Sequence, residues 1–368
     1  MVADFLAGIR VLDLSQYIPG PFATRQLADM GAEVIKIEPP TGDPMQGFGA
    51  PDHDGISIYY KLLNAGKSVT RLDLKTPEGK QAFERMVAKA DVLMESFRPG
   101  TLDKLGFPAS RLQEINPGLI HCALSGFGQT GPYRLRAGHD LTYVALAGAL
   151  AAQGTKETPV VADPPLADHA GAQQAVSAIL AALLGRARTG KGAYLDISLF
   201  EAALSLNYLE LAASQRPEGA TAREGGLING GAAYYRIYRS NDGRFLALGA
   251  LEAKFWHSFC EAVGRPDLAA RHSDPFPQTA LIEETAALFA SRSLADWQEL
   301  LASTDCCFEC VLTPGEALAH PHIRARGLVE SGPGWADIRL PVIADGKPPS
   351  PRKGFEVKTA EQVLMEMT

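Results

Sequence analysis

Apolar and polar positions follow two different periods along the first hundred residues. Short apolar runs typical of strands occupy residues 9–14, 32–37, 68–74 and 91–95. Between them, residues 22–30 and 76–89 carry the apolar spacing of amphipathic helices. Pro21 suits the first turn of the former helix, and Gly31 is placed to end it. Repeated strand–helix–strand units predict parallel strands, because each helical crossover returns the chain to the same end of the sheet.

The same alternation continues to about residue 200. Further strands are expected at residues 119–124 and 193–198, and apolar helices at 142–152, 171–188 and 203–213. We therefore predict an α/β fold whose large domain, residues 1–200, is a doubly wound sheet.

The pattern changes beyond the last of these helices. Residues 201–231 are expected to be the linker between the domains, because 215–226 are polar and rich in glycine. Asn241-Asp242-Gly243 between two apolar runs predicts a hairpin, and helices are expected near 253–263, 276–290 and 295–303. Residues 232–328 thus form a smaller α+β domain, and residues 329–368 are expected to return to the large domain.

Composition narrows the function classes. The 368 residues exceed what one core usually absorbs, which supports two domains, and 46% hydrophobic with 21% charged residues is typical of a globular enzyme. A net charge of −7 argues against a nucleic-acid partner. We find no apolar run long enough for a membrane span and no signal peptide, so we expect no membrane partner and a cytoplasmic location. Cys307 and Cys310 form a C-x-x-C pair without further ligands at suitable spacing, so we expect no metal site.

Three common chemistries lack their motifs. The first strand–helix turn, Ser15–Pro21, has no G-x-G-x-x-G, and its two prolines remove amide donors that a phosphate would use. The chain also has no Walker A sequence. Leu124–Gly128 places its serine before the first glycine, so it is not a G-x-S-x-G nucleophile elbow. NAD binding, ATP hydrolysis and serine hydrolysis are therefore not predicted.

Basic residues gather near the predicted strand ends of the large domain. They are Lys67, Arg71, Lys75, Arg98 and Lys104. Ligands of open α/β sheets bind outside the carboxyl ends of the strands, so these cations suit a polyanionic ligand. The alternative is that they only keep the surface soluble. Arg98 is the sharpest candidate, because the Phe97–Gly100 turn would hold it rigidly.

Two further segments carry candidate acid–base residues. His139 lies in Gly138-His139-Asp140, and Asp168 lies in Ala167-Asp168-His169 ahead of a long apolar helix. An imidazole and a carboxylate at loop–helix junctions can face one substrate from opposite sides, as moving a proton on and off a carbon requires. The alternative is that both residues merely cap their helices.

Motifs along the whole chain resemble the class III CoA-transferase family (CaiB/BaiF type). They are Pro19–Phe22, Leu27–Pro39, Leu72–Lys75, Phe97–Gly100, Ser125–Pro132 and Thr189–Gly192. The resemblance implies a Rossmann-like large domain, an interlocked homodimer and an acyl-CoA substrate, with no cofactor beyond the CoA carried by that substrate. It also implies CoA contacts from Tyr17, Leu72, Lys75, Arg98, Lys104 and Gly138.

The match is strongest to the 2-methylacyl-CoA racemase branch of that family. That branch uses a His, an Asp and a Glu at the positions of His139, Asp168 and Glu252. By this resemblance His139 and Asp168 exchange the α-proton and Glu252 supports His139. The alternative is a CoA-transferase in which Asp168 forms a covalent intermediate. A third reading, from a different class, is a CoA-binding protein without catalysis.

Overall fold

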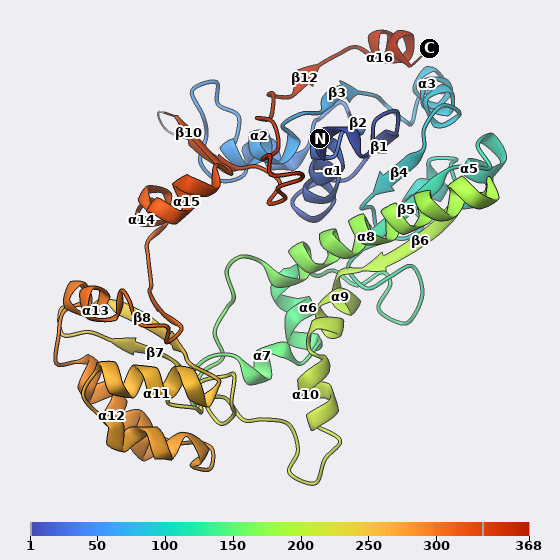
Figure 1. The fold of residues 1–368 in the computed structure, drawn as a ribbon. Helices are drawn as coiled ribbons and strands as arrows, with labels where there is room; N and C mark the ends of the chain where they lie inside the picture. The colour runs from blue at the N-terminus through green and yellow to red at the C-terminus, as the bar shows by residue number, and fades with distance from the viewer. Residues whose placement is uncertain (1, 333–334, 368) are drawn as a thin grey trace. The chain divides into compact units, whose positions relative to one another are not determined.

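A seven-stranded parallel sheet forms the centre of the first of two units in the computed structural model, which describes residues 2–332 and 335–367 (Figure 1). The strand order is β12-β3-β2-β1-β4-β5-β6. The strands are β1 (Arg10–Asp13), β2 (Glu33–Glu38), β3 (Ser68–Arg71), β4 (Val92–Glu95), β5 (Ile120–Ser125), β6 (Ala193–Ser198) and β12 (Glu356–Val357). The predicted α/β class with a doubly wound sheet is therefore confirmed.

Helices cover both faces of this sheet. The helices of the first unit are α1 (Pro19–Asp29), α2 (Ile58–Asn64), α3 (Pro77–Val87), α4 (Thr101–Lys104), α5 (Ala109–Ile115), α6 (Asp140–Leu146), α8 (Leu166–Thr189), α9 (Leu199–Leu206), α15 (Pro321–Arg326) and α16 (Ala360–Glu366). Leu12 and Leu93 pack with Phe83 of α3 on one face. Their neighbours Val11 and Val92 are also buried, and alternate strand residues point to opposite faces, so the other face is covered as well.

The strand order reverses beside β1. The chain runs outward through β2 and β3 on one side of β1, then returns to place β4, β5 and β6 on the other. The loops after β1 and β4 consequently diverge at the carboxyl ends of these strands. This is the switch point at which open α/β sheets bind ligands.

The second unit is inserted into the first and comprises residues 148–161 and 207–320. Its antiparallel sheet contains β7 (Tyr235–Arg239), β8 (Phe245–Gly249) and β9 (Phe308–Cys310). Its helices are α7 (Ala149–Ala152), α10 (Tyr208–Ala213), α11 (Ala253–Ala262), α12 (Thr279–Phe289), α13 (Leu294–Leu301) and α14 (Pro314–Ala319). Trp256, Phe259, Phe289 and Trp297 form the centre of its core.

The chain beyond the second unit returns to the first. A small hairpin, β10 (Val329–Gly332) and β11 (Trp335–Ile338), precedes β12 at the sheet edge. Arg352 donates to both carboxylate oxygens of Asp29 at 2.6 Å and pairs with Asp337 at 2.5 Å. These buried ion pairs attach the C-terminal segment to the end of α1.

Most elements lie within a few residues of their predicted positions, and the differences have local causes. Gly148 has φ of +76°, so the helix expected at 142–152 divides into α6 and α7. The helix expected at 203–213 is interrupted at Asn207, and the boundary between the units falls there, inside the 201–231 segment expected to join the domains. The helix expected from residue 171 begins at Leu166, which places Asp168 inside its first turn. Among the described residues, no helix has the length and apolarity that a membrane crossing would need.

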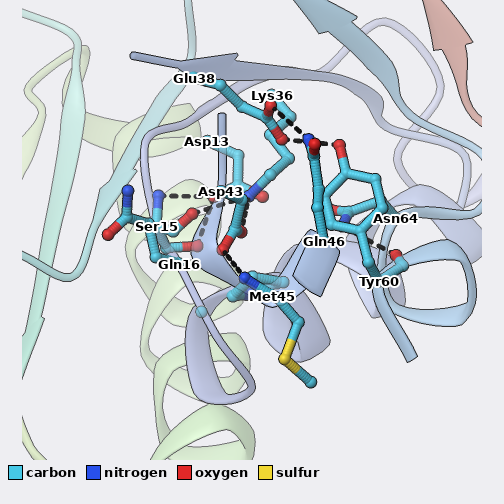
Figure 2. A network of polar contacts seen from close by, with 12 residues as sticks. Asp13, Ser15, Gln16, Lys36, Glu38, Asp43, Met45, Gln46, Tyr60 and Asn64 are labelled. Carbon is cyan, nitrogen blue, oxygen red and sulfur yellow. Dashed lines mark hydrogen bonds and ion pairs between the residues drawn. The ribbon is translucent and has the colours of Figure 1, made fainter. Parts of the chain in front are cut away.

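Buried charges beneath the switch point form the polar network drawn in Figure 2. Asp13, at the end of β1, accepts hydrogen bonds from Thr24 at 2.6 Å and from Lys67 at 3.0 Å. Lys36 donates to the Ser15 carbonyl at 2.8 Å and pairs with Asp43 at 2.9 Å. Burial alone would raise the pKa of Asp13, but Lys67, Lys36 and two hydroxyl donors lower it to about 2. The network therefore fixes the start of the β1–α1 loop.

Because each charge in this network is buried with its partner, removing one partner should be costly. We expect Asp13→Asn to lower the free energy of unfolding by about 3–5 kcal/mol. The double variant Asp13→Leu, Lys67→Met removes both charges and should recover at least half of that loss. Urea denaturation followed by circular dichroism measures both variants. A double variant less stable than Asp13→Asn would contradict this account.

Candidate active site

A cavity of about 490 Å³ opens at the switch point of the large sheet. Its walls come from the loops after β1, β4 and β5, from the segment before α6, and from the first turns of α8 and α9. The lining residues are Gln16, Tyr17, Pro19, Ser96, Phe97, Arg98, Pro99, Leu124, Ser125, Gly126, Phe127, Arg134, Arg136, Ala137, Gly138, His139, Tyr143, Asp168 and Leu199. All of them belong to the first unit.

The β1–α1 loop is held by contacts on both sides. The backbone N–H of Gln16 donates to the Ser96 hydroxyl at 3.0 Å, which ties the loop to the end of β4. Tyr17 follows with φ of +62°, a left-handed conformation that a bulky residue adopts only where its surroundings impose it. The residue is 46% exposed and lines the cavity wall. The buried network around Ser15 thus holds the loop that places the Tyr17 side chain at the cavity.

His139 occupies the N-cap position of α6 and is exposed. Its backbone, rather than its ring, makes the capping contacts: its N–H donates to the Thr142 hydroxyl at 3.1 Å, and its carbonyl accepts from that hydroxyl at 2.8 Å. The imidazole lies at the wall of the cavity, where a ligand can reach it.

Asp168 lies in the first turn of α8 and is half-buried at the same cavity. Burial is the main cause that raises the pKa of its carboxyl to about 6; Asp140 raises it further, whereas His169 and His139 lower it. At neutral pH the group is mostly ionised, yet it holds a proton far better than an ordinary Asp. Such a carboxyl can both accept and return a proton.

His169 turns away from the cavity. Its Nδ1 lies 2.6 Å from the Pro165 carbonyl oxygen, and its ring meets the Phe22 ring edge-on at 5.0 Å. Arg25 also lies over the Phe22 ring, with its guanidinium carbon 5.2 Å from the centroid. His169 therefore packs α8 against α1 and is not among the cavity-lining residues.

Two glycines allow Tyr143 to form the floor of the cavity. A Cβ at Gly126 would lie 2.4 Å from the Tyr143 hydroxyl oxygen, and a Cβ at Gly138 would lie 2.5 Å from Tyr143 Cε1. Burial, and secondarily Asp168, raises the pKa of Tyr143 to about 12, so its hydroxyl stays protonated. Gly138, predicted as a CoA contact, thus also provides the space into which this ring packs.

Three arginines supply positive charge at the cavity. Arg98 was predicted from the sequence, but Arg134 and Arg136 were not. Arg136 lies over the Tyr133 ring, with its guanidinium carbon 4.5 Å from the centroid. The signal available in the sequence was the basic pair in Tyr133-Arg134-Leu135-Arg136, directly ahead of the Gly-His-Asp segment.

Several predicted residues lie elsewhere. Leu72, Lys75 and Lys104 are not among the lining residues, because β3 is two strands away from the switch point and Lys104 lies at the end of α4. Lys67 is buried against Asp13, so its charge is used inside the protein and not for a ligand. Glu252 is the N-cap residue of α11 in the second unit. Its predicted support of His139 stays a prediction.

Comparison with known proteins gives a single family. The model of CoA-transferase family III matches residues 6–349. Alpha-methylacyl-CoA racemase from Homo sapiens is 35% identical over 327 residues, covering 88% of this chain and 81% of the racemase. Succinyl-CoA–D-citramalate CoA-transferase from Chloroflexus aurantiacus is 34% identical over 329 residues, covering 87% of this chain and 82% of the transferase.

A solved structure agrees with this result. The crystal structure of a CAIB/BAIF family protein from Brucella suis has a TM-score of 0.85 at 27% sequence identity and covers 99% of both chains. The agreement extends over both units of the chain. Racemase and transferase relatives are thus similar to this chain to nearly the same degree.

The close approach of Tyr143 predicts the effect of a single added methyl group. Gly138→Ala should displace the buried Tyr143 ring and lower the free energy of unfolding by about 1–3 kcal/mol. Gly185→Ala is the matched control, because a Cβ there meets nothing within 4 Å inside α8. That control should be neutral or gain up to about 1 kcal/mol. Equal stability of Gly138→Ala and the wild type in urea denaturation would refute the packing argument.

Proposed function

The chain belongs to CoA-transferase family III, and on that premise we propose that it is a 2-methylacyl-CoA racemase that moves the α-proton of its substrate between His139 and Asp168. Its relatives are racemases and CoA-transferases, so it is an enzyme of this family. The observation that carries the finer proposal is that an imidazole and a carboxyl with a raised pKa line one cavity.

The proposed reaction needs two groups of similar proton affinity. One base removes the α-hydrogen of the thioester, the C–H electron pair passes into an enolate, and the second group returns a proton to the opposite face of the carbon. Imidazoles titrate near neutrality, and the raised pKa of Asp168 brings its carboxyl close to that range. In the reverse direction the two groups exchange roles. Each can therefore serve as acid or as base near neutral pH.

The charge of the cavity supports a CoA thioester as the substrate. CoA carries a diphosphate and a ribose phosphate, and Arg98, Arg134 and Arg136 supply guanidinium groups beside the two candidate bases. Tyr17 adds an exposed aromatic surface at the same wall. These residues are the proposed contacts of the CoA portion, together with Gly138. Leu72, Lys75 and Lys104 remain proposed contacts for more distant parts of CoA.

A CoA-transferase is the second candidate, and one observation favours it. Transferase relatives match this chain at 34% identity, almost as well as the racemases. In that reaction the Asp168 carboxylate attacks the thioester carbonyl, CoA leaves as a thiolate, and a mixed anhydride remains on the enzyme. The thiolate then attacks the aspartyl carbonyl of that anhydride, which releases the donor acid as a carboxylate and leaves an aspartyl thioester. An acceptor carboxylate attacks this thioester and expels the thiolate, which attacks the acceptor's carbonyl in the new anhydride, forms the new acyl-CoA and frees Asp168.

We expect the enzyme to exchange the α-hydrogen of 2-methylacyl-CoA for deuterium in D₂O without any added acid. His139→Ala and Asp168→Ala should each lower the exchange rate by about 10²–10⁴-fold, because each removes one of the two proton-transfer groups. Proton NMR of the α-hydrogen signal measures the exchange directly.

The transferase would give a different result in the same experiment. There would be no exchange, but a new CoA thioester would form when a free carboxylic acid is supplied. Full exchange by both alanine variants would disprove the assignment of His139 and Asp168. Bound CoA with neither exchange nor transfer would indicate a CoA-binding protein without catalysis.

We also propose that the enzyme is a homodimer. Large apolar side chains are exposed on helices of both units, and apolar patches on soluble proteins mark contact surfaces. They include Leu141 at 44%, Leu184 at 65%, Leu206 at 56% and Tyr208 at 64% exposure.

Light scattering coupled to size-exclusion chromatography should therefore give about 79 kDa, twice the chain mass of 39.3 kDa. Leu184→Glu tests the surface with one exposed side chain and should shift the mass toward the monomer. A monomeric mass for the unmodified enzyme at micromolar concentration would contradict the proposal.

A further inference from the structure

The first turn of α8 is capped by a side chain from a different helix. Pro165, the N-cap residue of α8, supplies no side-chain hydrogen bond. Instead the Asp140 carboxylate accepts hydrogen bonds from the backbone N–H groups of Ala167 at 2.5 Å and Asp168 at 3.1 Å. One oxygen, Oδ1, accepts both. The helix that carries the candidate catalytic carboxyl is thus held by a residue 28 positions earlier in the chain.

Asp140 also belongs to the segment that carries the other candidate base. It is the first residue of α6 and directly follows His139. Its backbone is therefore bonded directly to that of His139, while its side chain accepts a hydrogen bond from the backbone of Asp168. The Asp140 side chain thus connects the segment that carries His139 with the helix turn that carries Asp168. These are the two proposed proton-transfer groups of the cavity. Neither helix propensity nor the apolar core requires this connection.

We propose that Asp140 is a positioning residue, whose carboxylate fixes the distance between His139 and Asp168 and places a negative charge beside Asp168. The proposal rests on the proposed function, but it applies equally to proton transfer and to nucleophilic attack by Asp168. Asp140 is not assigned contact with substrate. Its effect passes through the backbone of α8 and through the electrostatic field at the Asp168 carboxyl.

The charged groups around Asp168 allow the electrostatic effect of Asp140 on the Asp168 carboxyl to be distinguished from its positioning effect. His169 follows Asp168 on α8, and His139, Asp140 and Tyr143 from the α6 segment interact with its charge. Arg98, Arg134 and Arg136 complete the charged groups of the cavity wall. Asp140 is the carboxylate in this group that raises the pKa of Asp168, whereas the two histidines lower it. Replacing Asp140 by a neutral amide should therefore lower that pKa.

The positioning part is tested with two variants of Asp140. Asp140→Asn keeps an oxygen that accepts both N–H groups, and Asp140→Ala keeps none. We expect kcat to fall by about 10²-fold in Asp140→Ala and less than about fivefold in Asp140→Asn, with KM within about threefold in both.

Thr359→Ala is the matched control, because it removes the N-cap of α16, far along the chain in the same unit. It should lower Tm by a few degrees, as Asp140→Ala does, and leave kcat unchanged. Equal kcat losses in Asp140→Asn and Asp140→Ala would overturn the positioning role, and so would a kcat for Asp140→Ala within twofold of wild type.

The electrostatic effect of Asp140 on Asp168 is tested without an activity assay. The test is a double-mutant cycle of Asp140→Asn and Asp168→Asn with Tm as the measured quantity. The pKa of Asp168 is raised in the folded state, so its ionised form destabilises the fold as pH rises through about 6. Asp168→Asn should therefore raise Tm at pH 7.5, by about 2–4 °C, and by less at pH 5.0. In the Asp140→Asn background the gain at pH 7.5 should be roughly halved.

An unchanged gain in that background would overturn the electrostatic role of Asp140. The cycle also separates this proposal from the proposed function. A reduced gain in an enzyme that neither exchanges α-hydrogen nor transfers CoA would leave the role of Asp140 standing and remove the function. Normal α-exchange together with an unchanged Tm gain from Asp168→Asn in the Asp140→Asn background would support the proposed function and remove the electrostatic role of Asp140.

Discussion

The pairing of buried charges at the end of β1 is the constraint on which the large unit depends. Asp13 contacts the first residues of the β1–α1 loop, the helix α1 through Thr24, and the chain entering β3 through Lys67. Charges this deeply buried are tolerated only when each has its partner, so the three segments must meet in one arrangement. The same arrangement fixes Ser15, and through it the loop that carries Tyr17 to the cavity.

The cavity therefore lies between two sets of polar interactions, buried ion pairs on one side and side-chain-to-backbone hydrogen bonds on the other. On one side, ion pairs inside the sheet hold the loop after β1. On the other side, a carboxylate from α6 holds the first turn of α8 by hydrogen bonds to its backbone. His139 is exposed and Asp168 is half-buried, whereas Asp13 and Lys67, which hold the β1–α1 loop, are buried. Sites of this kind gain precision from rigid supporting residues, while the reacting groups stay accessible to a ligand.

The hydrophobic pattern was sufficient to predict six strands of the large sheet, the β7–β8 hairpin, most helices and the α/β class, because each of these strands is a short apolar run. It did not predict β12, which is only the two exposed residues Glu356–Val357. Loop–helix junctions, the Phe97–Gly100 turn and the family resemblance indicated His139, Asp168 and Arg98, which the fold brings to one cavity. Prediction from the sequence failed where a role depends on a distant partner. Lys67 was predicted as a ligand-binding cation, whereas the structure pairs it with Asp13. The contact between Asp140 and the first turn of α8 joins residues 28 positions apart, and no local pattern predicts it. Gly148 divided a helix that apolar spacing alone predicted to be continuous.

The path of the chain through the first unit imposes an order on its synthesis. The sheet edge beside β3 is filled by β12, and Asp29 receives its cation from Arg352, 323 residues later. A ribosome therefore releases all of the inserted unit while the first sheet still lacks its outer strand. The apolar side of α3 that contacts α16 stays uncovered for the same interval. Until β12 and α16 have left the exit tunnel, the nascent chain presents an unpaired sheet edge and an uncovered apolar helix face, which are the surfaces on which folding intermediates aggregate.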